Sequence, residues 1–255
     1  MTRSVFSIAL FVIASAFVAT SASAQTASIN QANKPAAVRF VRAYVIDDRL
    51  SALRSEADIQ SVVIKRLSLA RTVYVLQTRN GDIAKNGFYR IATSRHTRGW
   101  IHRSAIAVAN RAGEDQKVMS LIESRGEEID RLTLCRLLID RFPRSPLLAR
   151  ALLAMGKEAE RIARAISPRA RRRLSSLDEK HLSAPIRDYY LSDTALDRCS
   201  RLRIRFNFDE RTSLYTYDGQ AYREVIKKFP ASDEARQARR RLDQTEQKIA
   251  RHGNR

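Results

Sequence analysis

The stretch TVYVLQTRNGDIAKNGFYRIATSRHTRGWI, residues 72–101, decides the fold of the first half of the chain. It holds three short runs rich in β-branched and aromatic residues, at 72–76, 87–92 and 97–101. The first run ends at the turn-forming sequence RNGD, residues 79–82. Short runs of this kind, separated by turns, are typical of the strands of an all-β unit.

Two similar runs precede this stretch, at 41–46 and 62–64, so the strand pattern begins near Val38. We therefore predict one all-β unit over residues 38–108. A length of about 70 residues suits a small barrel, because a closed sheet leaves no edge exposed to other chains.

The second half of the chain predicts helices. Apolar residues recur at helical spacing over residues 114–125 and 127–142, and Pro143 ends the second segment. Ser145 and Pro146 then supply an N-cap and a first-turn proline for a third helix. The very short turn between the second and third segments indicates an antiparallel helical hairpin.

The same arrangement recurs near the C-terminus. Residues 222–232 align with residues 135–145, and Arg, Ile, Phe, Pro and Ser are identical at matching places. Ser232 is the expected cap of the last helix. The two copies lie 87 residues apart, so the sequence does not predict a regular tandem array.

An irregular insert separates the copies, from about residue 165 to residue 218. Residues 188–203 predict a helix, and residues 202–208 then alternate between apolar and polar side chains, as a strand does. A second strand would end at Tyr215 and Tyr217, which gives a β-hairpin lying on the helices.

The insert begins with a basic run. Such a run could attract a phosphate group or an anionic lipid surface, and the alternative is an ordinary solvated helix face. Its candidate residues for an anionic partner are Arg169, Arg171, Arg172 and Arg173.

The N-terminus has the three-part pattern of a secretory signal over residues 1–24. An uncharged, mostly apolar stretch covers residues 5–18, and Ala22-Ser23-Ala24 offers a signal-peptidase site. We predict cleavage after Ala24, a linker over residues 25–37, and export to a bacterial periplasm or exterior. An uncleaved anchor or a buried helix is the alternative. No later stretch approaches the roughly 20 apolar residues of a membrane-spanning helix, so no transmembrane segment is expected after cleavage.

The chain carries 47 Lys and Arg, 38 of them Arg, against 27 Asp and Glu, a formal net charge of +20. In an exported protein this charge favours an anionic envelope partner over nucleic acid. Arginine in particular favours bidentate contacts with carboxylate or phosphate groups. An Arg-rich coding bias would explain the same composition.

Chemistry-bearing residues are few. Cys135 and Cys199 are the only cysteines; they could form a disulfide in an oxidising compartment, or remain two buried free thiols. Four scattered His and two Cys argue against a metal site, and no cofactor motif is present. Nucleophile-elbow, zinc-protease and phosphate-loop motifs are also absent from the sequence. We therefore expect no catalytic residues and no enzymatic activity.

The first half resembles the bacterial SH3-like (SH3b) domain. That family shows the motifs L-N-V-R-x-x-P, G-x-x-V-x-V-L, W-x-K-V and G-W-V-x-x-x-x-L in this order. Residues 51–57, 70–76, 88–91 and 99–106 stand in their places, and Gly99-Trp100-Ile101 is the most specific match. The proline of the first motif is missing, and alanine replaces the glycine of the second.

The helical half resembles tetratricopeptide repeats through its two aliphatic-x-x-F-P-x-S … A-x-x-A segments. Such hairpins stack to bury their inner faces. The two resemblances imply an α+β fold. A small all-β SH3-like barrel, residues 38–108, is followed by a mainly α-helical domain of tetratricopeptide-like hairpins with a small β-hairpin insert, residues 109–255.

SH3b domains commonly bind cell-wall peptides or other proteins. The resemblance implies a non-enzymatic cell-envelope adaptor, whose barrel binds a peptidoglycan peptide or an envelope protein and whose helical domain holds a protein partner. The candidate residues are two tyrosines and a tryptophan lining a groove, with an arginine pairing a carboxylate: Tyr74, Tyr89, Trp100, Arg90 and Arg98. Trp100 could instead be a half-buried structural residue. A charge-driven binder of anionic membrane or wall polymer, and an accessory subunit of a wall hydrolase, are the alternatives.

Overall fold

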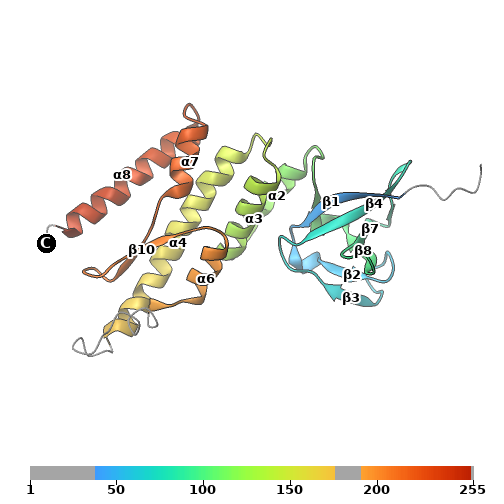
Figure 1. Cartoon of the computed structure of the whole chain (residues 1–255), viewed down its shortest axis with the longest axis horizontal. Helices are drawn as coiled ribbons and strands as arrows, with labels where there is room; N and C mark the ends of the chain where they lie inside the picture. The colour runs from blue at the N-terminus through green and yellow to red at the C-terminus, as the bar shows by residue number, and fades with distance from the viewer. Residues whose placement is uncertain (1–37, 176–190, 254–255) are drawn as a thin grey trace, which may run out of the picture. The chain divides into compact units, whose positions relative to one another are not determined.

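A computed structural model describes residues 38–175 and 191–253 (Figure 1). Its fold is α+β, as predicted: an antiparallel sheet of many strands is followed by a helical region with six α-helices in the described part of the chain. The predicted signal peptide, residues 1–24, and linker, residues 25–37, lie outside the described residues. None of the described helices is long and apolar enough to span a bilayer.

The sheet follows the predicted strand runs closely. The pairings are all antiparallel, and the main strand order is β3-β2-β8-β7-β4-β1-β9, with β5 and β6 as short ribbons beside β4 and β7. The strands are β1 (Arg39–Val45), β2 (Ala52–Arg54), β3 (Val63–Arg66), β4 (Thr72–Thr78), β5 (Gly81–Asp82), β6 (Ala84–Lys85), β7 (Phe88–Ala92), β8 (Arg98–His102) and β9 (Ile106–Val108).

The predicted closure of this sheet into a barrel is not observed. Strand β3 at one end pairs with β2, β9 at the other end pairs with β1, and these two end strands are not joined in the described residues. All four residues of β3 are exposed, and the pairing register shifts between Leu53 and Arg54 of β2. Closure needs a consistent tilt and stagger around the whole sheet, which these short, irregular end strands do not provide.

One face of the sheet is buried. Alternate residues of the long central strands point to the same side, as the period of two requires. They form a core of fully or nearly fully buried aliphatic side chains, which includes Ala43, Val45, Leu53, Val73, Val75, Ile91, Ile101 and Ile106.

The helical region also follows the sequence. Pro143 and Pro230 each stand two residues after the last residue of a helix. The hydroxyl oxygens of Ser145 and Ser232 accept hydrogen bonds from Leu147 N (3.1 Å) and Ala235 N (3.1 Å), as N-caps do. The helices are α2 (Glu114–Ser124), α3 (Glu128–Arg141), α4 (Leu148–Ser175), α6 (Thr194–Arg201), α7 (Gln220–Lys228) and α8 (Asp233–Gly253).

The predicted β-hairpin is confirmed. Strands β10 (Phe206–Asp209) and β11 (Leu214–Tyr217) pair antiparallel, and Figure 1 shows them running between α4 and α8. The Tyr215 amide donates to the Ser167 hydroxyl at 2.8 Å, which fixes β11 against α4. Helix α4 continues through Pro168 to Ser175, so the start of the predicted insert is helical.

The sheet and the helices share buried apolar contacts. Tyr44, Ile46 and Ala107 belong to the same core cluster as side chains of α2, α3 and α4, and the Tyr44 ring meets the Phe142 ring edge-on at 6.2 Å. The Lys117 ammonium group on α2 donates to the carbonyl of Ile106 at 2.6 Å, at the end strand β9. These contacts place residues 38–255 in one compact unit.

Candidate functional site

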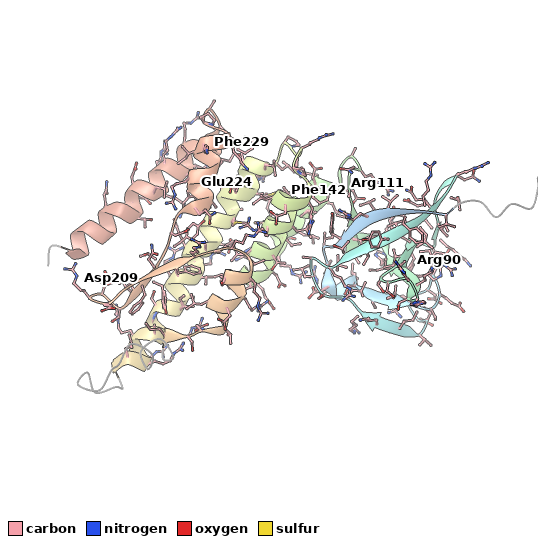
Figure 2. All side chains as sticks on the ribbon, viewed as in Figure 1. Arg90, Arg111, Phe142, Asp209, Glu224 and Phe229 are labelled. Atoms are coloured by element: carbon pink, nitrogen blue, oxygen red, sulfur yellow. The ribbon has the colours of Figure 1, made fainter. Side chains whose placement is uncertain are left out.

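The outward face of the sheet collects four of the five predicted ligand-binding residues. Tyr74 of β4 is paired with Ala92 of β7, which is paired with Arg98 of β8, and Arg90 is paired with Trp100. Directly paired residues of antiparallel strands project to the same side. Tyr74, Arg90, Arg98 and Trp100 therefore share the face opposite the aliphatic core; Arg90 is labelled in Figure 2.

A groove of about 510 Å³ runs across part of this face, and its surface is mostly apolar. Phe40 and Tyr74 supply aromatic surface and are 52% and 37% exposed. The Arg98 guanidinium lies 6.0 Å from the centre of the Phe40 ring, which is within the range of a cation–π contact. The lining residues are Phe40, Tyr74, Ala92, Ser94, Arg95 and Arg98. We call this set the sheet groove.

Trp100 lies beside the sheet groove and does not line it. Its side chain is half-buried, and the Arg90 guanidinium stacks over the indole at 5.6 Å. This cross-strand pair covers the outer face next to β2, where Arg54 is paired with Trp100. The sequence left two roles open for Trp100, an exposed binding residue and a half-buried structural residue. Its position in the structure is the half-buried one.

Tyr89 lies on the opposite face of the sheet. It neighbours Arg90 in β7, so alternation turns its side chain toward the core, where it packs against the buried cluster. Its hydroxyl accepts a hydrogen bond from Arg111 at 3.3 Å, and Arg111 in turn pairs with Asp82 at 2.7 Å. The expectation that Tyr89 shares a groove with Tyr74 is therefore wrong.

Phe40 and Arg95 of the groove were not predicted from the sequence. Phe40 stands two residues before Arg42, which is paired with Tyr74, so the period of two places Phe40 on the outer face. The sequence did show that Phe40 alternates with core residues of the first strand, which places it among the outward-facing positions. To place it beside Tyr74 also requires the pairing register of β1 and β4, and the local sequence does not reveal that register.

The basic run of the insert does not form one patch. Arg169 and Arg173, one turn apart on α4, both pair with Asp193, at 3.3 and 3.0 Å. Arg171 donates to the carbonyl of Thr212 at 3.1 Å, and Arg172 to that of Pro168 at 3.4 Å. Successive helix residues are rotated by about 100°, so Arg171 and Arg172 face other surroundings than the Asp193-bound pair Arg169 and Arg173.

Cys135 and Cys199 are free thiols, and both are buried. Burial raises the pKa of the Cys135 thiol far above its usual range and that of Cys199 to about 11. Both are therefore protonated at neutral pH and poorly suited to act as nucleophiles. The disulfide weighed from the sequence is not formed.

Two acidic side chains at or just after strand ends, Asp47 and Asp209, accept hydrogen bonds from the backbone. Asp47 accepts from Arg49 N at 3.1 Å, and the Arg125 guanidinium bonds to the carboxylates of both Asp47 and Asp48. Asp209 accepts from Arg211 N at 3.0 Å at the hairpin turn. Within residues 38–175 and 191–253, no group of three His, Cys, Asp or Glu side chains is placed to hold a metal ion.

The sheet groove can bind by stacking on its aromatic rings and by charge at its arginines, and its lining residues include no nucleophile–base pair.

No protein-family model, characterised protein or solved structure matched the chain in comparisons with known proteins.

Proposed function

We propose that this chain is a non-enzymatic binding protein of the bacterial cell envelope, which recognises a peptide of the wall or a segment of an envelope protein through its sheet. The observation that carries the proposal is the sheet groove. Exposed Phe40 and Tyr74 form an apolar floor, and Arg95 and Arg98 line the same groove.

The chemistry of the groove suits an extended peptide with a free carboxylate. Aromatic side chains bury large apolar area with little loss of rotamer entropy. A guanidinium group binds a carboxylate through two parallel hydrogen bonds. Arg98 already lies over Phe40, so one ligand group could contact the ring and the charge together.

The proposal includes an SH3b-like first half and a tetratricopeptide-like second half. An SH3b-like origin of residues 38–108 is supported by the strand β8, which carries Gly99-Trp100-Ile101, and by the order of the strand runs. A tetratricopeptide-like character of residues 109–255 is supported by the two hairpins, α3–α4 and α7–α8, each with Phe-Pro-x-Ser at its turn. The helical region would then hold a second protein partner.

A charge-driven binder of anionic membrane or wall polymer is the second candidate, and the net charge of +20 favours it. The two candidates differ in their dependence on salt. Binding that rests on exposed charges weakens steeply as salt screens them, whereas stacking in an apolar groove does not.

The test is a pull-down of the purified protein on isolated peptidoglycan at low and high salt. Tyr74→Ala should reduce the bound fraction severalfold at both salt concentrations, whereas Arg98→Gln should do so mainly at low salt, because salt screens the exposed Arg98 charge. Ile59→Ala is the matched control, because Ile59 is a 66% exposed side chain outside the groove, and this variant should bind like the wild type.

Two results would argue for the second candidate. One is binding that disappears at high salt in the wild type. The other is binding that is lost when Arg171, Arg172 and Arg173 are changed together to Ala but survives Tyr74→Ala. Binding only in the presence of a wall hydrolase would point to the accessory-subunit alternative. Thermal melts of each variant check that the fold is retained.

A further inference from the structure

A second hollow lies in the helical region, away from the sheet groove. It has a volume of about 550 Å³ and lies between α4, the β10–β11 hairpin and α8. That volume falls within the range of about 300–1,000 Å³ that is typical of small-molecule sites. We call it the α4–α8 cavity.

Its lining is mixed, and two tyrosine rings and an alanine supply part of the apolar surface. Ala163 of α4 and Tyr215 and Tyr217 of β11 line it, and all three are buried. The Tyr215 hydroxyl donates to Leu191 O at 2.9 Å, and the Tyr217 hydroxyl accepts from Ala221 N at 2.6 Å. Since both hydroxyls have partners elsewhere, the two tyrosines contribute mainly ring surface to the cavity.

Three arginines line the same cavity: Arg164, Arg171 and Arg241. Arg241 is neutralised, because it pairs with Glu160 at 2.6 Å. The other oxygen of that carboxylate accepts from the Tyr222 hydroxyl at 2.9 Å, so Glu160 is fully engaged.

The remaining two arginines are not neutralised. Within the described part of the chain, Arg164 has neither a hydrogen bond nor an ion pair, and Arg171 makes one hydrogen bond, to a neutral carbonyl. Asp209, labelled in Figure 2 at the hairpin turn, also lines the cavity and accepts from the backbone of its own turn, so three arginines face two carboxylates there. The cavity therefore combines buried tyrosine rings with an excess of one positive charge, and its exposed Arg164 and Arg171 are free of any carboxylate partner among the described residues.

We propose that the α4–α8 cavity binds a small amphipathic anion, with a phosphate or carboxylate group on Arg164 and Arg171 and an aromatic or short aliphatic body against the tyrosines. The two arginines are seven residues apart, which is about two helical turns and roughly 10 Å. They lie on the same face of α4, and long, flexible side chains can converge from that separation on one anionic group. The site is independent of the sheet groove, so either can fail without the other.

The test is calorimetric titration of the full chain with 1-naphthyl phosphate, with inorganic phosphate and neutral 2-naphthol as partial ligands. Binding of naphthyl phosphate should be at least tenfold tighter than binding of either partial ligand. Arg164→Gln and Arg171→Gln should each weaken it about tenfold or more, which is the effect expected from a lost charge-assisted hydrogen bond. Arg164→Gln removes no hydrogen bond or ion pair within the described chain and changes an exposed side chain, so this variant should fold normally.

Arg172→Gln is the matched control. It removes the same charge from the same helix, at a residue that does not line the cavity, and it should bind like the wild type. Equal loss in all three variants would overturn the proposal in favour of general charge attraction. So would equal affinity for inorganic phosphate, absence of naphthyl phosphate binding, or binding only to vesicles of anionic phospholipid, which would indicate a surface interaction with lipid headgroups.

Discussion

At the residue scale, Arg125 joins the start of the sheet to the helices. Its side chain is only 8% exposed, and its guanidinium pairs with Asp47 at 3.1 Å, with Asp130 at 2.9 Å and with Asp48. These carboxylates raise the pKa of Arg125 above its usual value, against the effect of burial. The arginine is therefore charged at every pH at which the protein folds.

Replacing Arg125 should destabilise the protein strongly. Arg125→Ala would remove a cation that three carboxylates share, and of these Asp47 and Asp130 are only 6% and 14% exposed. Breaking a buried pair of this kind costs about 3 kcal/mol. Urea unfolding measures the difference. Arg49→Ala is the comparison, since Arg49 also pairs with Asp47 but is largely exposed, and it should lower the midpoint much less than Arg125→Ala does. Equal effects of the two substitutions would contradict the role given to Arg125.

Asp47 should make stability depend on pH. Burial alone would raise the pKa of this carboxyl group, but hydrogen bonds from Arg49 and the charge of Arg125 bring it below its usual value. The folded pKa lies below the unfolded pKa of about 3.9. The stabilisation is therefore complete above that pH and is lost as the pH falls through the folded pKa.

Urea midpoints between pH 6 and pH 3 test this dependence. Asp47→Asn keeps a side-chain oxygen that can accept from Arg49 N, but it removes the titrating carboxyl group. The variant should be less stable than the wild type at pH 6, and the difference should shrink toward pH 3. A constant difference across this range would contradict the assignment.

At the scale of elements, α4 and α7 touch through a glycine. Gly156 lies against the buried ring of Tyr222, and a Cβ added there would overlap that ring. Alanine normally favours a helix over glycine by about 1 kcal/mol. Here Gly156→Ala should instead destabilise the protein by about 1–3 kcal/mol, because overpacking a rigid contact costs more than the propensity gains.

Gly126→Ala is the matched control for this contact. A Cβ at Gly126 would meet no other atom within 4 Å, so this variant should be close to neutral in thermal and urea unfolding. A Gly156→Ala variant more stable than the wild type would show that α7 does not pack on α4 in this way.

The elements themselves were largely predictable from the sequence. Period-two runs gave the long strands β4, β7 and β8, and Pro143, Ser145, Pro230 and Ser232 marked the helix ends, because these signals are local. The two-residue ribbons β5 and β6 are too short to leave a pattern. Barrel closure was predicted wrongly because it depends on stagger accumulated over many strands.

The candidate site was predictable only in part, for the same reason. Tyr74 and Arg98 were found by their chemistry, Trp100 lies beside the groove without lining it, and Tyr89 lies on the opposite face. Its immediate neighbour Arg90 points outward, so the alternation within β7 already excluded Tyr89 from that face. Phe40 was missed because only the pairing of β1 with β4 brings it beside Tyr74.

At the scale of the whole molecule, the sheet and the helical region should unfold together. Tyr44, Ile46 and Ala107 of the sheet half are buried among the helices, so melting either half exposes apolar surface of the other. Trp100, the only tryptophan, reports on the sheet by fluorescence, and circular dichroism at 222 nm reports on the helices. The two transitions should coincide, and separate midpoints would contradict this shared core.

The central claim is that the sheet groove binds a peptide ligand, and photo-crosslinking tests it most directly. A benzophenone side chain is placed at Phe40 in one protein and at Ile59 in another. Each protein is irradiated with soluble peptidoglycan fragments and analysed by mass spectrometry. We expect a fragment-bearing adduct from position 40, reduced by Arg98→Gln, and little or none from position 59. Equal crosslinking from both positions, or crosslinking at position 59 alone, would contradict the account.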